Sequence, residues 1–336
     1  MNKPKITSLD VAAKAGVSQS AVSRVFSGAS ASKSTIQKVR DAADELGYRP
    51  NVLARSLITG QSKIIGLVVA YLDNQFYPDA LERLSNALQE QGYHILIFMA
   101  SGEGTDVDRV VGELLDYQVD GIITASVGMS DNLTRRCEAA GIPVVLFNRG
   151  QDDVRLSQVT SDNQAGARKI ADFLIAGGHQ RIAHISGWEG SSTGRERQVG
   201  FLQALADHGI DPVAVTDGEY KRDVAAKAAL DMVKAVQPDA IFVGNDHMAF
   251  AVIDALRFDA KLCIPDEISI VGYDDVPMAA WPSYDLTTMR QPSNRMVEAT
   301  VETLLAQIVD RNIPPQKIAI DGPLVVRGSA RKPKDT

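Results

Sequence analysis

The chain has 336 residues, more than a single hydrophobic core normally serves, so at least two domains are expected. Hydrophobic residues make up 45% and charged residues 23%, and no apolar run approaches the ~20 residues of a membrane helix, which excludes a membrane protein. The first ten residues lack the apolar stretch of an export signal, and Cys137 and Cys263 form no paired motif, so a cytoplasmic location is expected.

The charge is divided unevenly along the chain. The net charge is −7, but residues 1–60 carry nine Lys and Arg against four Asp and Glu, a net charge of +5. The remaining residues carry 26 basic against 38 acidic side chains, a net charge of −12. A basic end on an acidic body is expected when one small module meets a polyanion. Charge alone does not distinguish this from a basic terminus that is merely solvated.

A short helix is predicted near the amino terminus. Thr7 can cap it, and Leu9, Ala12 and Ala13 follow the spacing of one buried face. Gly16 then ends the helix, and the chain turns at once toward a second helical segment.

The second helix is predicted to be amphipathic, with Ser18 as its cap. Its buried side chains are expected to be Val22, Val25 and Phe26. The opposite face is polar and uncovered, with Gln19, Ser20, Ser23 and Arg24. Two short helices joined by a tight turn indicate a helix-turn-helix, whose second helix enters the major groove of DNA. The spacing alone also occurs in helical proteins that do not bind DNA.

A third helix, from about Thr35 to Leu46, is predicted to close this small core and to end at Gly47. Its core side chains are expected to be Ile36, Val39, Ala43 and Leu46. The segment from 51 to 60 then places Leu53, Ala54 and Leu57 at helical spacing, but it is too short to be a stable helix by itself. It therefore needs a partner on which to fold.

Several short motifs follow one another along this region. They are Ser8-Leu9-Asp10-Val11-Ala12, Ala15-Gly16-Val17-Ser18, Val22-Ser23-Arg24-Val25, Leu46-Gly47-Tyr48, Pro50-Asn51 and Ala54-Arg55-Ser56-Leu57. Together they closely resemble the headpiece and hinge of the lactose-repressor/galactose-repressor (LacI/GalR) family of transcription regulators. Further motifs extend the resemblance through nearly the whole chain. They include Ser161-Asp162-Asn163, Asn245-Asp246 and the run from Ser269 to Asp275.

The resemblance implies which residues contact double-stranded operator DNA. Gln19 and Ser20 match the recognition-helix positions that choose bases, and Arg24 matches a groove-contacting arginine. Thr7 and Ser23 match groove and phosphate contacts. The full implied set is Thr7, Ser18, Gln19, Ser20, Ser23, Arg24, Asn51, Ala54 and Leu57. Leu57 matches a hinge leucine that is wedged into the minor groove in relatives, and the alternative is a linker residue packing on the core.

From Ile64 onward, short runs of Val, Ile and Leu alternate with amphipathic stretches, the βα repetition of parallel sheets covered on both faces. Seven strands, each buried on both faces, are predicted at 64–70, 95–99, 121–125, 144–147, 182–186, 240–243 and 268–273. The predicted fold class is α/β, with an all-α helix-turn-helix headpiece and a body built of parallel sheets. Resemblance to periplasmic sugar-binding proteins implies two subdomains that flank a cleft and are joined by crossings near residues 160, 290 and 320.

The predicted domains are a headpiece at 1–49, a hinge helix at 50–60, an effector-binding and dimerisation domain at 61–330 and a tail at 331–336. One subdomain takes about 61–160 plus 291–320, and the other takes 161–290 plus the C-terminal end. The family assembles as dimers through this body. The tail after Leu324 has no leucine heptads for a tetramerising coil, so a homodimer is expected.

Polar residues that follow the predicted strands should line one ligand site, because ligands of open α/β sheets lie beyond the carboxyl ends of the strands. Carboxylates, amides, an arginine and aromatic rings suit a ligand rich in hydroxyl groups, such as a sugar. The positions that match effector contacts of the family are Phe76, Tyr77, Asn148, Arg149, Ser191, Thr193, Arg197, Tyr220, Asn245 and Asp274. Any single one of these could instead be a loop-end cap or an ion-pair partner.

One position departs from the family pattern. Many relatives have Asp before Arg where this chain has Asn148-Arg149, so a carboxylate that would neutralise the arginine is missing. This departure adds weight to an acidic sugar derivative as the effector. The resemblance therefore implies a repressor of carbohydrate-uptake or catabolism genes, controlled allosterically by a small sugar or sugar-acid effector.

Other chemistry has little support in the sequence. The run from Gly190 to Gly194 satisfies the G-x-S-x-G pattern of hydrolases, but three residues separate it from the preceding strand, whereas a nucleophile elbow turns directly into a helix. No phosphate-binding loop is present, and the five histidines lack metal-ligand spacing, so neither a cofactor nor a metal is predicted. Two alternative functions remain. One is an exported sugar-binding protein, in which residues 1–60 would have no function, and the other is a sugar-metabolising α/β enzyme.

Overall fold

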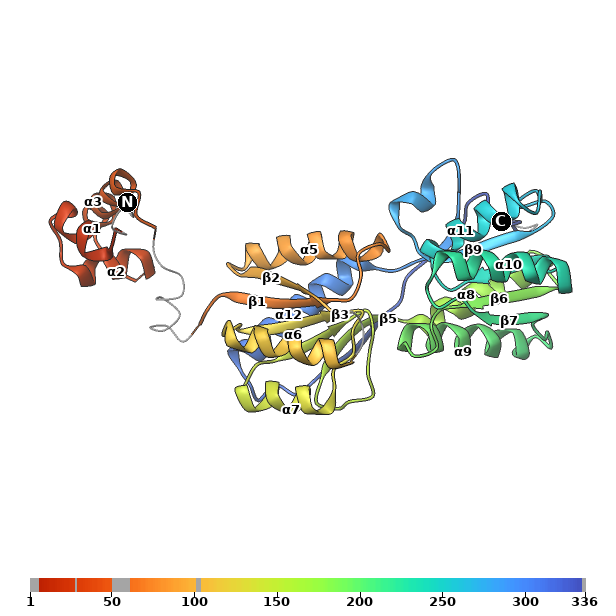
Figure 1. Ribbon diagram of the computed structural model, residues 1–336, viewed down its shortest axis with the longest axis horizontal. Coiled ribbons are helices and arrows are strands. Elements are labelled where there is room, and N and C mark those ends of the chain that lie inside the picture. The colour runs from red at the N-terminus through yellow and green to blue at the C-terminus, as the bar shows by residue number, and fades with distance from the viewer. Residues whose placement is uncertain (1–5, 28, 50–60, 101–103, 334–336) are drawn as a thin grey trace. The chain divides into compact units, whose positions relative to one another are not determined.

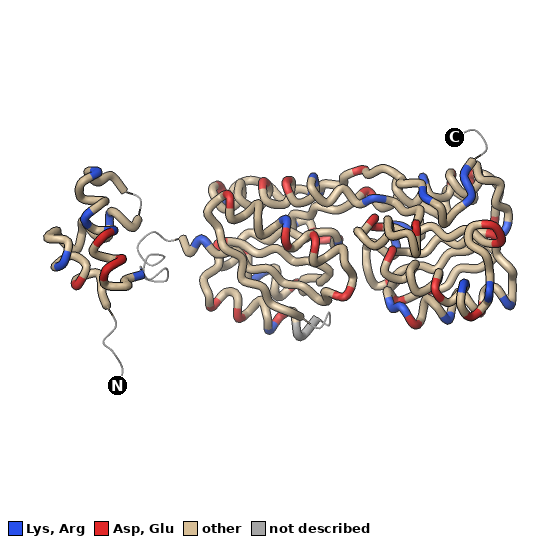
Figure 2. Tube along the Cα trace, turned by 90° about the horizontal axis from the view of Figure 1, so that it is seen from above, with Lys and Arg blue, Asp and Glu red and all other residues tan. Residues whose placement is uncertain are grey.

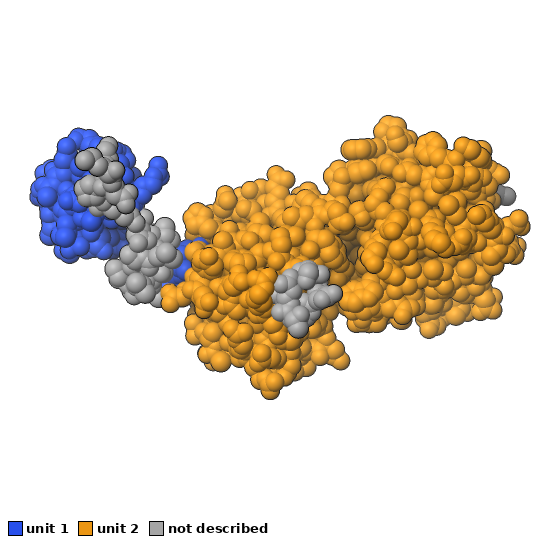
Figure 3. Space-filling view, viewed as in Figure 1, with its two compact units in different colours: residues 1–63 blue, residues 64–336 orange. Residues whose placement is uncertain are grey.

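The computed structural model describes residues 6–27, 29–49, 61–100 and 104–333 of the chain. These residues divide into two compact units, 1–63 and 64–336, which are coloured separately in Figure 3. Among the described residues, no helix is long and apolar enough to cross a membrane.

The first unit consists of three helices, α1 (Ser8–Ala15), α2 (Gln19–Ser27) and α3 (Lys33–Leu46). They enclose a small core of Val11, Ala12, Val22, Val39, Ala42 and Ala43. Gly16 and Gly47 end α1 and α3 in the left-handed conformation, in which the backbone N–H of each glycine reaches carbonyl groups of the last turn. Helix α3 begins two residues before the predicted start because the Ser32 hydroxyl caps it.

The predicted buried face of α1 is wrong at two of its three positions. Leu9 is 60% exposed and Ala13 is also exposed, whereas Val11 and Ala12 are buried. On a helix, positions 8, 11, 12 and 15 share one face, and Leu9 and Ala13 lie on the neighbouring face, about 100° away. The capped start at Thr7 therefore turns Val11, rather than Leu9, into the core.

The second unit contains two six-stranded sheets, each covered by helices on both faces (Figure 1). The first sheet is entirely parallel. In spatial order it consists of β11 (Lys317–Ile320), β5 (Ser157–Ser161), β4 (Val144–Phe147), β3 (Gly121–Ala125), β1 (Ile64–Val69) and β2 (His94–Met99). Its helices are α5 (Phe76–Glu90), α6 (Gly104–Asp116), α7 (Asp131–Ala140) and α12 (Ser293–Val309). We call this half the first subdomain.

The second sheet is parallel except at one edge. Its spatial order is β12 (Leu324–Val325), β10 (Thr287–Arg290), β9 (Ser269–Asp274), β8 (Ala240–Val243), β6 (Ile182–Ser186) and β7 (Ala214–Asp217), with β12 antiparallel to β10. Its helices are α8 (Asn163–Ala176), α9 (Ser192–Asp207), α10 (Arg222–Val236), α11 (Asp246–Phe258) and the short η1 (Pro277–Ala280). We call this half the second subdomain.

The chain passes between the two subdomains where β5 leads into α8, where β10 leads into α12 and where β11 leads into β12. Figure 3 shows the two lobes of this unit with an indentation between them. All seven predicted strands are present, but β2 is not buried on both faces. Ile97 is 52% and Met99 48% exposed, because β2 is an edge strand with a neighbour on one side only.

Candidate functional site

The exposed face of α2 carries the four polar side chains that the sequence places there. Gln19, Ser20, Ser23 and Arg24 are all exposed. The Gln19 amide nitrogen donates to the Ser8 hydroxyl at 3.1 Å, which ties the start of α2 to the start of α1. Ser18 caps α2, since its hydroxyl accepts from the Ala21 backbone N–H at 3.2 Å, and it lies 2.9 Å from the Ser20 hydroxyl.

Thr7, at the start of α1, already has a structural partner. Its backbone N–H and its hydroxyl both donate to the Asp10 carboxylate, at 2.8 and 2.7 Å. Helices α1 and α2 thus present a rigid polar surface on a small unit, and Figure 2 shows Lys and Arg distributed over that unit. The predicted hinge residues Asn51, Ala54 and Leu57 lie outside the described residues.

A polar pocket lies between the two subdomains, at the carboxyl ends of the strands. It is lined by Tyr71, Asp73, Asn74, Tyr77, Asn148, Arg149, Thr193, Arg197, Tyr220, Asn245, His247 and Asp274. The pocket holds about 20 Å³ of space, little more than one water molecule occupies. Its side chains therefore nearly fill it, and a sugar-sized ligand would require the subdomains to separate.

Eight of the ten predicted effector positions line this pocket, and Phe76 and Ser191 do not. The Phe76 ring stacks on Phe147, with centroids 6.2 Å apart, and lines a neighbouring pocket together with Asp274 and Gln291. The Ser191 hydroxyl caps α9 by accepting from the Gly194 backbone N–H at 3.0 Å. Both side chains thus shape the elements that carry the pocket.

Four lining residues are absent from the predicted set: Tyr71, Asp73, Asn74 and His247. Tyr71, Asp73 and Asn74 follow β1 at its carboxyl end, and His247 follows β8 directly after Asn245 and Asp246. The strand-end rule covers all four positions and had indicated Asp73, although none of the four matches an effector contact of the family.

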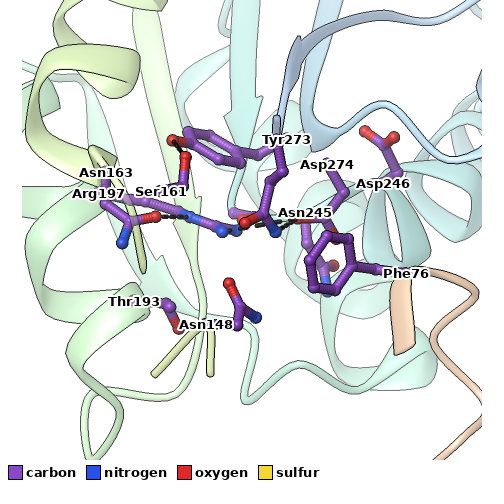
Figure 4. Close-up of polar contacts among 12 residues, drawn as sticks. Phe76, Asn148, Ser161, Asn163, Thr193, Arg197, Asn245, Asp246, Tyr273 and Asp274 are labelled. Atoms are coloured by element: carbon purple, nitrogen blue, oxygen red, sulfur yellow. Dashed lines mark hydrogen bonds and ion pairs between the residues drawn. The ribbon is translucent and has the colours of Figure 1, made fainter. Parts of the chain in front are cut away.

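Arg197 lies at the centre of the second subdomain's wall and is 3% exposed (Figure 4). Its Nε donates to the Asn163 side-chain oxygen at 2.9 Å, and its Nη1 donates to the Gly244 carbonyl at 2.7 Å. The guanidinium lies 3.6 Å from the centre of the Tyr273 ring and 3.5 Å from the Asp274 carboxylate. It is therefore fixed on several sides before any ligand arrives.

Asp274 connects the pocket to the crossing segments. Its carboxylate accepts from the Gln291 amide at 2.7 Å, and from the Asn74 amide of the first subdomain at 3.4 Å. Burial raises the pKa of Asp274, and the Arg197 guanidinium opposes that rise. Behind it, burial and the Asp274 carboxylate raise the pKa of Asp246 to about 8. Asp246 accepts a hydrogen bond from the Thr288 hydroxyl at 2.5 Å.

Arg149 forms much of the opposite wall. Its Nη1 donates to the Ser126 carbonyl at 3.0 Å, and its Nη2 donates to the Tyr71 hydroxyl. The guanidinium lies 5.5 Å from the ring centres of both Tyr71 and Tyr220. Beside it, the Asn148 amide donates to the Tyr77 hydroxyl at 3.0 Å.

Polar contacts between described residues join one subdomain to the other across or beside the pocket. The Gly150 backbone N–H donates to the Ser192 hydroxyl at 2.9 Å, and Asn74 donates to Asp274. His247 lies 3.7 Å from the Asp73 carboxylate at the rim. These contacts hold the subdomains together through groups that also can bind ligand oxygens. Within the described part of the chain, no cluster of three or more His, Cys, Asp or Glu could hold a metal ion.

Comparison with known proteins places both units among regulators. Residues 7–51 match the family of bacterial regulatory proteins, lacI family, and residues 171–330 match the periplasmic binding protein-like domain. The chain is 32% identical over 331 residues to the HTH-type transcriptional regulator CelR of Thermobifida fusca, with 95% of this chain and 96% of CelR covered. It is 30% identical to the HTH-type transcriptional repressor PurR of Aliivibrio fischeri (strain MJ11), with 95% and 97% covered.

Two solved structures resemble the whole chain. A lac repressor dimer bound to operator and the anti-inducer ONPF has a TM-score of 0.88 at 27% identity, covering 97% of this chain and 99% of that one. A complex of the transcriptional regulator CelR with cellobiose has a TM-score of 0.73 at 30% identity, covering 97% and 100%.

Proposed function

Because this chain belongs to the lacI family of bacterial regulatory proteins, we propose that it represses genes of carbohydrate uptake or catabolism under the control of a small sugar or sugar acid. The proposal is supported by two separate features that occur in the same chain. One is a helix-turn-helix with an exposed polar face, and the other is a polar pocket between two covered sheets. Neither a sugar-binding protein nor a sugar-metabolising enzyme needs the first feature.

On the DNA side, α2 is the recognition helix. Gln19 and Ser20 are exposed on its first turn, where base edges are read, and Arg24 is one turn further along. Thr7, Ser18 and Ser23 contact phosphates or groove edges. Asn51, Ala54 and Leu57 contribute the hinge contacts that the family resemblance implies.

On the ligand side, the effector occupies the pocket between the subdomains. A ligand changes a conformational equilibrium only through different affinities for the two states, and the contacts that cross the pocket provide that difference. A bound ligand replaces hydrogen bonds that join the two subdomains, and this changes how the subdomains meet. The bonds concerned run from Asn74 to Asp274 and from Gly150 to Ser192. That change is the signal that reaches the headpiece.

The regulator acts as a homodimer in the cytoplasm, and at the operator it is part of the nucleoid. Unit 2 exposes the apolar side chains of Phe258 at the end of α11 and Trp281 beside η1. These elements are neighbours, since Arg257 donates to the Ser283 carbonyl. Exposed apolar patches of this kind mark protein interfaces, and a second copy is the occupant expected here. Sedimentation velocity at micromolar concentration checks the assembly.

A mobility-shift experiment tests the proposed function. The full chain is titrated onto the DNA upstream of its own gene, with and without sugars and sugar acids, beside a Gln19→Ala, Ser20→Ala double variant. A specific shift that one ligand changes, and that the double variant lacks, supports the proposal. Ligand binding without any DNA shift indicates a sugar-binding protein, and conversion of the ligand indicates an enzyme.

A further inference from the structure

Arg149 is a partly buried cation for which the described residues supply no negative partner. Its hydrogen-bond partners are the Ser126 carbonyl and the Tyr71 hydroxyl, both uncharged. Its other near neighbours are the aromatic rings of Tyr71 and Tyr220, whose centres each lie 5.5 Å from the guanidinium. Among the described residues, no carboxylate forms an ion pair with its guanidinium, and none is among the groups that shift its pKa.

The rest of the pocket does not offset this charge. Arg197, the second guanidinium of the pocket, is buried, and Asp274 already faces it at 3.5 Å. Asp73 lies at the rim, where 70% of its side chain is exposed, and it faces His247 instead. The pocket thus contains two guanidinium groups and one buried carboxylate. An unpaired charge that is partly removed from water is unfavourable, so a ligand that supplies a negative charge to Arg149 gains affinity.

The free edge of Arg149 fits a planar anion. Nη1 and one hydrogen of Nη2 are engaged, whereas Nε is buried and has no hydrogen-bond partner. Nε and Nη2 share one edge of the planar guanidinium, and the hydrogens along that edge form two parallel donors, a fork that matches the two oxygens of a carboxylate. The Asn148 side-chain oxygen is also buried without a partner and can accept from a ligand hydroxyl group.

We propose that the effector is a sugar acid whose carboxylate pairs with the Nε and Nη2 edge of Arg149, while its hydroxyl groups bind the amides and Asp274. A carboxylate brings one negative charge, which balances the one unpaired cation. A phosphate ester brings nearly two and would need a second cation, but Arg197 is occupied by Asp274. This inference rests on the proposed function, because it assumes that the pocket is the effector site.

Calorimetry on the full chain provides the test. The probes are D-gluconate, D-glucuronate and D-galacturonate, each compared with its neutral parent sugar, together with D-glucose 6-phosphate. At least one acid should bind at least tenfold more tightly than its parent and than the phosphate ester. The inference is overturned if none of the three acids binds, or if a neutral sugar or the phosphate ester binds as tightly.

Two substitutions at the pocket and one control make the test specific. Arg149→Gln should weaken the best acid by about 10- to 100-fold. Asn148→Asp should weaken the acid at least tenfold and strengthen its neutral parent, because it supplies the missing carboxylate next to Tyr77. Position 148 has a φ of 70°, which Asp adopts nearly as readily as Asn, so this variant fits the backbone if Arg149→Gln does not fold.

Arg135→Gln removes one positive charge from the exposed surface of α7 and should leave acid binding unchanged. An equal loss in this control would assign the effect to overall charge and overturn the role of Arg149. The mobility shift separates this inference from the proposed function. If a neutral sugar releases the operator, the inference that the effector is a sugar acid is wrong but the proposed function stands. If an acid binds without affecting DNA binding, only the proposed regulatory function is wrong.

Discussion

Asp274 is the residue at which ligand binding and subdomain contact meet most directly. It pairs with Arg197, accepts from Gln291 of a crossing segment and accepts from Asn74 across the pocket. Truncating Arg197 would leave this buried carboxylate unpaired, and such a change typically costs about 3–5 kcal/mol of stability. Asp274→Asn is the cleaner substitution, because an amide keeps an oxygen for the Gln291 donor.

Asp274→Asn should therefore fold and should raise the effector concentration needed to change operator binding by tenfold or more. The physical reason is the loss of a charge-assisted hydrogen bond, worth about 1.5–3 kcal/mol, in a nearly dry pocket. Calorimetry with the effector measures the affinity, and an operator-binding titration follows the response. Unchanged effector affinity would remove Asp274 from the site, and loss of operator binding without effector would indicate a structural role.

His184 predicts how the second unit responds to acid. Its ring is fully buried between Phe201 and Phe242, and burial lowers its pKa to about 4. The unfolded chain takes up this proton near pH 6.5 and the folded chain only near pH 4, so the stability contribution is complete above pH 6.5 and is lost as the pH falls toward 4. This amounts to roughly 2 kcal/mol at pH 5.

Urea unfolding at pH 7 and pH 5, followed by tryptophan fluorescence, measures this loss. Trp188 and Trp281 are the only tryptophans of the chain and both belong to the second unit, so the signal reports that unit alone. His184→Gln should reduce the pH dependence by about the same 2 kcal/mol. Equal pH dependence in the two proteins would contradict the assignment to His184.

At the residue scale, the sequence indicated both the strand ends that surround the pocket and the carboxylate that is missing beside Arg149. Tyr77, Asn148 and Thr193 line one pocket, because the carboxyl ends of parallel strands meet at one edge. Sequence spacing could not show that the Ser191 hydroxyl caps α9, because a serine at this position is equally suited to capping a helix and to contacting a ligand. The prediction that Leu9 is buried was wrong for a similar reason. Two neighbouring faces of α1 carry apolar residues, and the sequence does not show which of them faces the core.

At the element scale, the three helices of the first unit depend on caps as well as on a very small core. Ser32 caps α3, and its hydroxyl accepts from the Thr35 backbone N–H at 3.1 Å. Ser32→Ala should destabilise the headpiece by about 1 kcal/mol. The matched control is Ser34→Ala, which removes an exposed hydroxyl from the first turn of the same helix but leaves the cap intact.

Hydrogen exchange detected by mass spectrometry on the full chain can follow the headpiece separately. Peptides covering α1 to α3 should exchange about fivefold faster in Ser32→Ala, and peptides from the second unit should be unaffected. Faster exchange of equal size in Ser34→Ala would show that the hydroxyl acts through something other than the cap.

The strands that were not predicted show where hydrophobic periodicity fails to identify a strand. β1, β3, β4 and β8 are apolar runs in the middle of a sheet, and their predicted positions agree closely with the structure. The five missed strands are β5, β7, β10, β11 and β12. They are short, β5 and β10 are mostly polar, and all five lie at or near the sheet edges or next to a crossing. Their strand character comes from pairing with a neighbour, which a single-sequence pattern does not contain.

At the scale of the whole molecule, the distribution of charge agrees with the proposal that the headpiece binds DNA and the body binds the ligand. Residues 1–60 carry a net charge of +5 and the rest of the chain −12, so only the headpiece end is attracted to DNA. Phosphate contacts from this end supply sequence-independent affinity, and the exposed face of α2 supplies the choice of sequence.

The final prediction concerns the operator and Leu57. Two headpieces related by a twofold axis require a pseudo-palindromic site, and two hinge leucines inserted at its centre favour a flexible pyrimidine–purine step there. Leu57→Ala should lower the affinity for this operator while sparing most of the affinity for unrelated DNA, because the phosphate contacts of the headpiece are unchanged. Fluorescence anisotropy with both DNAs, each over a range of salt concentrations, measures the two affinities. Equal losses on both DNAs would contradict the wedge, and a footprint covering one asymmetric half-site would contradict the twofold arrangement.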